Sequence, residues 1–256
     1  MRLLSYNIRE GGVGRAEEIA EVIKAARPDV VALQEARDPA VVEQIARLAG
    51  FQHWGSRRSH STGFLSHIPV IGYDWRHPPR TRHALLEVSF ADGFPRVFVL
   101  HLRAWFSKWS ERRRAQELRG LLDGIQKQLI QEEHAFAFHV LAGDFNALAP
   151  GELLDPSHMP GWIRGMIWLS GRDIARSTIE MMQSDGYVDA WRTVHGDQQH
   201  AGGHTFPVWD PHVRLDYVFT PAMYASRFTG CEVLRTPEVV RTASDHFPLL
   251  VEISDQ

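Results

Sequence analysis

The sequence predicts an α/β fold in which short buried strands alternate with amphipathic helices. Apolar runs recur along the chain between glycine, proline and polar residues, which is typical of strands buried in a core. Several of these runs are separated by segments whose apolar residues recur at helical spacing. The chain has 256 residues, of which 44% are hydrophobic and 23% are charged, as in an ordinary globular protein. This length allows a sizeable core in one domain and would also permit two domains.

The first elements are expected to be a strand, a helix, a strand and a helix. Residues 2–8 and 29–34 are the two apolar runs. Between them, segment 15–26 carries a helical stripe made of Ala16, Ile19, Ala20, Ile23 and Ala26. The second helix is expected to begin after Asp38, which can cap it, with Pro39 in its first turn. Gly50 is expected to end it.

The middle of the chain predicts a β-rich region over residues 51–101 and then the longest helix over residues 110–130. The buried stripe of that helix is expected to contain Leu118, Leu121, Leu122, Ile125 and Leu129. Arg112, Arg113 and Arg114 are expected on its solvated face. A strand that ends in a polar turn is expected at 137–146, a helix at 171–184, and further strands at 214–220, 231–235 and 248–253.

Residues 149–170 differ from the rest because they combine three prolines with tryptophan, isoleucine and methionine side chains. We interpret them as a hydrophobic flap. It either packs on the core, which is the simpler interpretation, or covers a substrate.

Charge and cysteine content restrict the class of protein. The net charge of -3 gives no support for a protein that holds nucleic acid by charge alone, although bound metal cations would change the charge at a site. The single cysteine, Cys231, allows neither an internal disulfide nor a zinc site of the multi-cysteine kind, which fits a reducing compartment. The first residues are too short an apolar run for a signal peptide, and no stretch approaches the roughly 20 apolar residues of a membrane span. We therefore expect a cytoplasmic protein without a membrane span, and the sequence leaves its oligomeric state open.

Several apolar runs begin with, carry or end in a polar residue that can bind a metal ion or move a proton. These residues are Asn7, Glu35, His101, Asp144, Asn146, Asp216, Asp245 and His246. Burying unpaired carboxylates and imidazoles costs several kcal/mol, and a cation between them would offset that cost. The oxygen ligands on offer suit Mg²⁺, Mn²⁺ or Ca²⁺ better than zinc.

Each of these residues also has an ordinary structural interpretation. Asn7 and the Gly-Asp-Phe-Asn segment can be turn residues, and Glu35 can form a surface ion pair. His101 can be a hydrogen-bonded core histidine, and Asp245 can cap a strand or helix. The functional interpretation therefore depends on the whole set and its order along the chain.

That ordered set resembles the endonuclease/exonuclease/phosphatase superfamily. The motifs are SYNI, LQEARD, LHLRAW, GDFNA, RLDYVF and SDHFPL, and they run from residue 5 to residue 249. Together they are specific for the superfamily and poorly specific for the substrate. The resemblance implies one domain over residues 1–256, built as a four-layer α/β/β/α sandwich of two mixed sheets flanked by helices.

The resemblance also implies roles for these residues. The metal ligands would be Asn7, Glu35, Asp144, Asn146 and Asp245, with Mg²⁺ or Mn²⁺ as the ion and Ca²⁺ as an alternative. The catalytic group would contain His101, Asp144, Asn146, Asp216 and His246. His246 would act as the base while Asp216 orients its ring, and His101 would contact the phosphoryl oxygens or assist the leaving group. The pattern also calls for a glutamate behind His101, for which Glu87 is a poor match.

Three functions remain open at this point. The first is a phosphodiesterase that cleaves DNA, with Trp105, Phe106 and Trp109 stacking on bases or simply anchoring the long helix. The arginines that could line a phosphate groove are Arg57, Arg58, Arg76, Arg80, Arg82 and Arg103. The second is a phosphodiesterase or phosphatase for small molecules or lipid headgroups. The third, which the intact set of site residues disfavours, is a binding module without catalytic activity.

Overall fold

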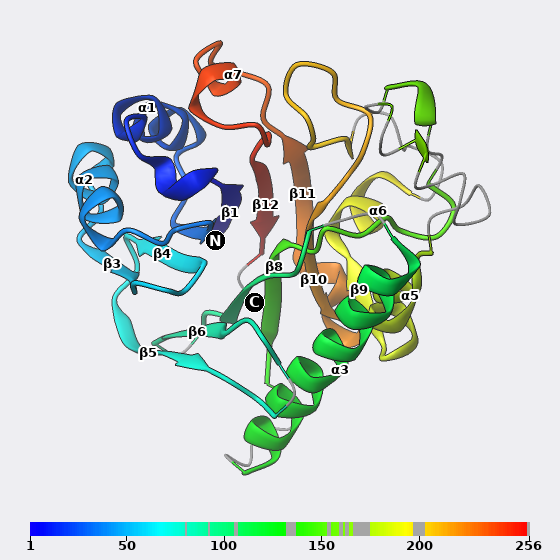
Figure 1. Cartoon of the computed structure of the whole chain (residues 1–256). Helices are drawn as coiled ribbons and strands as arrows, with labels where there is room; N and C mark the ends of the chain where they lie inside the picture. The colour runs from blue at the N-terminus through cyan, green and yellow to red at the C-terminus, as the bar shows by residue number, and fades with distance from the viewer. Residues whose placement is uncertain are drawn as a thin grey trace.

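Two six-stranded sheets pack face to face in the computed structural model, and helices cover their outer sides (Figure 1). The structure describes residues 1–79, 81–91, 93–104, 107–131, 137–152, 155–158, 161, 164–165, 175–196 and 203–254. Figure 1 places α1 and α2 beside one sheet and α3 and α5 beside the other. The predicted four-layer sandwich of mixed sheets is therefore confirmed.

The first sheet joins the two ends of the chain. Its strands, in spatial order, are β11 (Phe228–Val233), β12 (Leu249–Ile253), β1 (Arg2–Asn7), β2 (Val30–Gln34), β4 (Thr62–Ser66) and β3 (His53–Ser56). The pair β1 and β2 is parallel, and the other pairs are antiparallel.

The second sheet is built from the middle of the chain. Its order is β5 (Val70–Arg76), β6 (Leu85–Phe90), β7 (Arg96–His101), β8 (His139–Asp144), β10 (Asp216–Pro221) and β9 (Tyr187–Asp189). Here the pair β7 and β8 is parallel, and the other pairs are antiparallel. Each sheet thus has one parallel pair near its centre, and the carboxyl ends of a parallel pair meet at one edge.

The described helices are amphipathic elements and short turns. They are η1 (Glu10–Gly12), α1 (Ala16–Ala26), α2 (Pro39–Ala49), α3 (Lys108–Gln131), η2 (Pro156–His158), α5 (Ser177–Ser184), α6 (Ala190–His195), η4 (Ala222–Arg227) and α7 (Val240–Ala243). Asp38 caps α2 by accepting from the Ala40 amide at 3.0 Å, and Gly50 ends it in a left-handed conformation, both as predicted.

The core lies in two layers. Apolar side chains of both sheets meet in the larger cluster, for example Leu4 and Val31 with Val97 and Val140. The second cluster lies under α3, where the predicted leucine and isoleucine stripe is buried against the outer face of the second sheet. Because the sheets share a core, their ends are held in a fixed relation to each other.

The solvated face predicted for α3 needs one correction. Arg112 and Arg113 are exposed as predicted, but Arg114 is fully buried. Its guanidinium binds Glu111 at 2.7 Å and the backbone carbonyl of Arg103 at 2.8 Å, while Glu111 also accepts from the Thr178 amide on α5. Arg114 lies four residues before Leu118, so helical spacing places it on the buried stripe of α3, where it pairs inside the α3–α5 interface.

The expected helix at 171–184 is observed from Ser177, and its first residues, 171–174, lie outside the described part of the chain. Most of the hydrophobic flap predicted at 149–170 also lies outside the described residues, as do Trp105 and Phe106. None of the described helices has the length and apolarity needed to cross a membrane.

Candidate active site

Three of the predicted catalytic residues lie side by side at one edge of the second sheet. His101 at the end of β7 is the register partner of Asp144 at the end of β8. Asp144 is in turn the register partner of Asp216 at the start of β10. Cross-strand partners project from the same face of a sheet, so the three side chains form a row across three strands. Both carboxylates are buried, with 1% of each residue exposed.

A close backbone contact holds this row together. A Cβ atom at Gly143 would lie 1.9 Å from the backbone oxygen of Leu100, so only glycine fits between β7 and β8 at this point. Gly143 and Leu100 directly precede Asp144 and His101. The glycine of the GDFNA motif therefore sets how closely the two functional side chains approach.

The first sheet adds Asn7 to the same site. Asn7 ends β1 and donates its side-chain amide to Asp144 Oδ2 at 3.1 Å, across the interface between the sheets. Asn146 lies on the other side of Asp144, because its backbone amide donates to Asp144 Oδ1 at 2.9 Å. Asn146 has a φ of 50° and directs its side-chain amide to the Leu102 carbonyl at 3.0 Å, which leaves its Oδ1 available as a ligand.

His246 and Asp216 form a buried pair. His246 Nδ1 lies 2.8 Å from Asp216 Oδ2, and His246 Nε2 lies 3.9 Å from Asp144 Oδ2. The Phe206 ring packs against the imidazole with 4.8 Å between the ring centroids. Ser244 anchors the segment by donating to the Asn7 carbonyl at 2.6 Å. The carboxylate thus fixes the ring and turns Nε2 toward the centre of the site.

Glu35 and Asp245 are held at the rim by the Arg9–Glu10 segment. The Glu10 backbone amide donates to Glu35 Oε2 at 2.6 Å, and Arg9 Nε lies 3.8 Å from Asp245 Oδ2. Arg9, Glu10 and Glu35 all have φ between 48° and 59°, a left-handed conformation that is unusual without glycine. Such residues persist where the surroundings hold them in place, and they cluster at functional sites.

The site has an uneven charge distribution. Burial alone would lower the pKa of His246, but attraction to Asp216 and the hydrogen bond with it outweigh this effect and raise the pKa to about 10. Burial lowers the pKa of His101 to about 3, with a further contribution from the neighbouring His83. Burial also raises the pKa of Asp144, against the attraction of His246. These shifts of pKa favour the cationic form of His246 and the neutral form of His101.

Asp216 is positioned by a buried ion network that sequence reasoning missed. Arg214, two residues earlier, is 2% exposed and binds Asp189 at 2.5 Å and Glu152 at 2.7 Å. Thr205 also accepts from the backbone amide of Asp216 at 3.4 Å. These contacts fix the start of β10 and with it the carboxylate that orients His246.

Besides Asp144, whose Oδ2 lies 3.7 Å from His101 Nε2, a carboxylate of α3 lies behind His101. Glu87 is occupied elsewhere, because it binds Arg76 at 2.6 Å and Arg96 at 2.9 Å. Instead, Glu117 Oε1 lies 3.0 Å from His83 Nδ1, and the His83 ring stacks near His101 with centroids 6.4 Å apart. Glu117 therefore has no direct hydrogen bond with His101 among the described contacts and reaches it across the His83 ring. The sequence gives no sign of this arrangement, because His83 and Glu117 are far apart along the chain.

The pair of Glu117 and His83 gives a pH-dependent prediction. Burial works to raise the pKa of Glu117, but hydrogen bonds from the His83 side chain and backbone outweigh it and lower the pKa. A lowered carboxylate pKa stabilises the fold above the unfolded value of about 4.3, and this stabilisation is lost as the pH falls through the folded pKa. Glu117→Gln should therefore lower the free energy of unfolding by about 1–3 kcal/mol at neutral pH.

The measurement is urea unfolding of both proteins across this pH range, with the exposed Glu43→Gln as a control. The deficit of Glu117→Gln should shrink as the pH falls below the normal carboxylate pKa. An equal deficit at all pH values would contradict the assignment.

The donor set fits a hard divalent cation. Asp144 accepts from the Asn7 side-chain amide and from the Asn146 backbone amide, so the three residues lie together, with Glu35 and Asp245 at the rim. Asp144 is a desolvated carboxylate, and a cation would offset the cost of burying its charge. Oδ1 of Asp216 is also buried, and no described residue forms a hydrogen bond with it. Oxygen ligands of this kind are those that Mg²⁺ and Mn²⁺ prefer.

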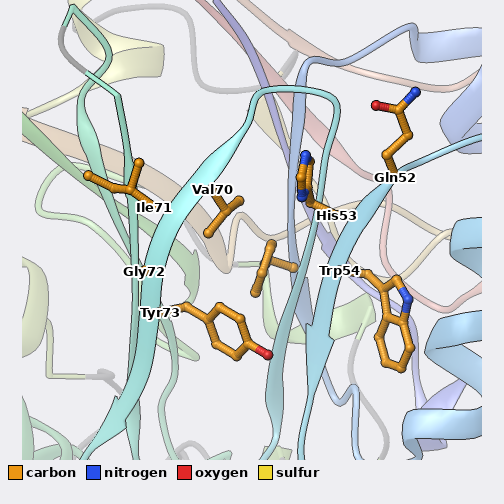
Figure 2. Close-up of a pocket in the computed structure, with 8 residues that line it drawn as sticks. Gln52, His53, Trp54, Val70, Ile71, Gly72 and Tyr73 are labelled. Atoms are coloured by element: carbon orange, nitrogen blue, oxygen red, sulfur yellow. The ribbon is translucent and has the colours of Figure 1, made fainter.

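A pocket elsewhere shares none of these residues. It has a volume of about 340 Å³ and lies between the edge strands β3 and β5, lined by residues that include Trp54, Phe64 and Tyr73 (Figure 2). The predicted site residues instead gather where the strands of both sheets end.

Comparison with known proteins places this chain in a family. The model of the endonuclease/exonuclease/phosphatase family matches residues 4–246. A comparison with curated proteins gives no significant match.

Several solved structures share the fold. An endonuclease/exonuclease/phosphatase from Beutenbergia cavernae is 22% identical with a TM-score of 0.69, over 100% of this chain and 71% of that chain. An AP endonuclease from Archaeoglobus fulgidus is 18% identical with a TM-score of 0.69, over 99% of both chains. D. rerio TDP2 complexed with a single-strand DNA product is 19% identical with a TM-score of 0.65, over 99% of this chain and 98% of that chain.

Proposed function

The chain belongs to the endonuclease/exonuclease/phosphatase family, and we propose that it is a divalent-metal-dependent phosphodiesterase that cleaves DNA. The observation that carries this proposal is the group of His101, Asp144 and Asp216 at the ends of three paired strands, with His246 bound to Asp216. Such a group is costly to bury and has the composition needed for phosphate-ester hydrolysis.

DNA is favoured among the possible esters by two independent observations. One similar structure is an AP endonuclease, and another holds a single-strand DNA product. On this chain, Trp109 is 56% exposed at the start of α3, with the Arg113 guanidinium 3.8 Å and the Arg103 guanidinium 5.4 Å from its ring centroid. An exposed aromatic ring beside guanidinium groups suits a nucleic-acid strand, because rings stack on bases and arginines contact phosphates.

In this proposal Asn7, Glu35, Asp144, Asn146 and Asp245 would hold the cation. A bound divalent ion supplies positive charge that polarises the phosphoryl group and stabilises the negative charge of the transition state. We propose Mg²⁺ or Mn²⁺ as this ion, since the donors are oxygen atoms.

The chain's own residues orient the phosphate and manage the protons. Neutral His101 would donate a hydrogen bond from Nε2 to a phosphoryl oxygen, and Asp216 holds the ring of His246 in place. As a cation, His246 also donates from Nε2. His246 can accept a proton from water only after losing its own. Asp144 and Asp245 contribute to its raised pKa, and both are assigned to the metal, so a bound cation would weaken their effect on the pKa of His246.

We also propose a cytoplasmic location. It is supported by the single cysteine, which is buried and not paired in a disulfide.

The test of this proposal is a substrate panel with Mg²⁺, Mn²⁺ and Ca²⁺, each with and without EDTA. The panel contains single- and double-stranded DNA, abasic DNA, RNA, sphingomyelin and an aryl phosphodiester. We expect metal-dependent cleavage that is fastest on DNA. Preference for sphingomyelin or for the aryl diester would favour the alternative substrate class, and the absence of turnover on all substrates would favour a binding module without catalysis.

Trp109 provides a prediction about DNA binding. Trp109→Ala should raise KM for single-stranded DNA by about tenfold, because stacking on one base contributes about 1–3 kcal/mol. The KM for a small aryl phosphodiester should stay the same. Steady-state kinetics on both substrates measure the difference.

Tyr73→Ala is the matched control for this variant. Tyr73 is an aromatic residue that is also half exposed, but it lies in the pocket of Figure 2. An equal change in KM for both substrates, or an equal effect of Tyr73→Ala, would contradict a stacking role for Trp109.

A further inference from the structure

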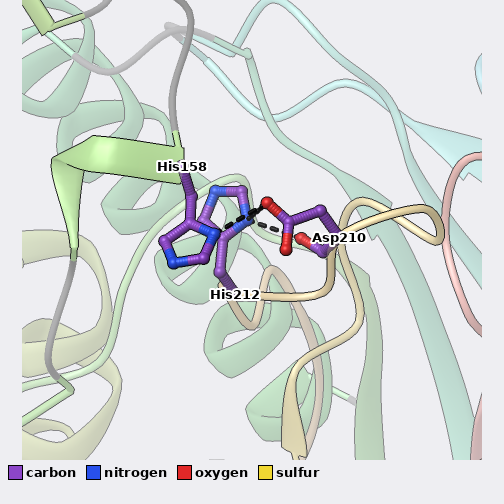
Figure 3. Close-up of side chains that lie close together, drawn as sticks. All are labelled: His158, Asp210 and His212. Atoms are coloured by element: carbon purple, nitrogen blue, oxygen red, sulfur yellow. Dashed lines mark hydrogen bonds and ion pairs between the residues drawn. The ribbon is translucent and has the colours of Figure 1, made fainter.

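A cluster outside the candidate active site combines two histidines with a carboxylate. His158 ends the short helix η2, while Asp210 and His212 lie in the segment that leads to β10. One ligand atom from each of the three residues lies within 4.8 Å of the others. Figure 3 shows both imidazoles beside the Asp210 carboxylate. Residues 52 positions apart in the sequence are thus brought to one point on the surface.

The contacts within the cluster are close and directional. His158 Nδ1 lies 2.7 Å from Asp210 Oδ2, and His212 Nδ1 lies 3.7 Å from the same oxygen. The two imidazole rings stack with centroids 5.2 Å apart and an interplanar angle of 27°. Asp155 adds a second carboxylate, with Oδ2 3.8 Å from His158 Nε2.

His212 is the best-fixed member of the cluster. Its side chain is only 11% exposed, and its Nδ1 donates to the backbone carbonyl of Asp210 at 2.6 Å. This bond orients the ring and leaves Nε2 with a lone pair, as in metal-binding histidines whose other nitrogen is hydrogen-bonded. His158 and Asp210 are 42% and 45% exposed, so an ion could reach them and retain water ligands.

The chemistry of this cluster differs from that of the candidate active site. Two imidazoles and a carboxylate are the protein ligands of many zinc sites that keep a position open to water. Nitrogen-rich sets select transition ions, whereas Mg²⁺ and Ca²⁺ prefer oxygen alone. We propose that His158, Asp210 and His212 form a second metal site, which binds Zn²⁺ or a similar divalent transition ion. This site goes beyond the proposed function and does not depend on it.

The position of the site suggests what the ion would do. The segment that carries Asp210 and His212 is attached to the candidate active site, because the Val208 amide donates to the Asp245 carbonyl at 3.0 Å. Phe206, at the start of this segment, packs on His246. A bound ion would therefore fasten η2 to the rim of the active site and restrict the movement of both segments.

The test is calorimetric titration of the metal-stripped protein with Zn²⁺ in an excess of Mg²⁺, which occupies oxygen sites. We expect the wild type to bind one Zn²⁺ ion per chain. His158→Ala should bind this ion at least about 100-fold more weakly or not at all. Loss of a direct ligand should cost more affinity than the 10–100-fold loss that follows when a partner of a ligand is removed. Asp210→Asn, which keeps the shape but removes the charge, should also weaken this equivalent. The matched control is His67→Ala, which removes an exposed imidazole that stacks on Phe51 and should leave Zn²⁺ binding unchanged.

Two results would overturn the proposal. One is equal Zn²⁺ stoichiometry and affinity in the wild type and in His158→Ala. The other is Zn²⁺ binding that is lost in Asp144→Ala but kept in His158→Ala, because the ion would then be at the candidate active site. Neither result depends on whether the protein cleaves DNA, so failure of this proposal is distinct from failure of the proposed function.

Discussion

Replacing His246 with alanine is expected to lower kcat/KM for a phosphodiester by about 10²–10⁴-fold, the usual contribution of a group that transfers a proton in the transition state. The expectation follows from the position of the ring. Its Nδ1 is bound to Asp216 at 2.8 Å, and its Nε2 faces Asp144, at the centre of the candidate site. The measurement is steady-state kinetics with saturating Mg²⁺ or Mn²⁺.

Two further variants separate catalysis from folding. Asp216→Asn keeps the shape of the side chain but removes the charge that orients the imidazole and raises its pKa, so it should lower kcat and change the pH profile while KM stays close to the wild-type value. His67→Ala is the control, since it removes an exposed histidine outside the site. Near-normal activity in a purified and folded His246→Ala protein would refute the assigned role.

Replacing Asp144 with alanine is expected to abolish both turnover and the stabilisation of the fold by divalent metal. Asp144 contacts Asn7, Asn146, His101 and His246, so its carboxylate is the point at which the two sheets share the site. A ligand that binds only the folded state at 100 times its Kd stabilises it by about 2.7 kcal/mol. The wild type should show a rise in Tm with added Mg²⁺ or Mn²⁺, and Asp144→Ala should show none.

The control for this experiment is Asp74→Ala, which removes an exposed carboxylate from β5. It should keep the metal-dependent rise in Tm. If Asp144→Ala kept the full rise as well, Asp144 would not be a ligand, even if activity were lost. Measuring stability and turnover in the same proteins thus separates metal binding from the chemical step.

Much of the architecture could be predicted from the sequence because periodicity reports burial directly. The apolar runs at β1, β2, β7, β8, β10 and β12 and the stripes of α1, α2 and α3 all have many consistent positions. The short elements β9, α6 and α7 did not stand out, since three to six residues give too little periodicity. The polar residues at strand ends also predict that His101, Asp144 and Asp216 lie close together, because the ends of neighbouring strands meet at one edge of a sheet.

What could not be predicted are contacts that depend on how distant elements pack. The sequence aligns Arg114 with Leu118 on the buried stripe of α3, but it gives no sign that the neighbouring Glu111 also accepts from the Thr178 amide of α5, 67 positions away. It also gives no sign that Arg214 joins Asp189 and Glu152, which lie 25 and 62 positions away. Each of these long-range contacts depends on the distance between two surfaces, which no local pattern encodes.

The row of His101, Asp144 and Asp216 has a consequence for how the length of this chain can change. The three side chains share one face only because β7, β8 and β10 are paired in a single register. Adding or deleting one residue within any of these strands would turn the following side chain to the opposite face of the sheet. Length variation among relatives should therefore be confined to the connections between strands, and the strands themselves should keep a constant number of residues up to the site.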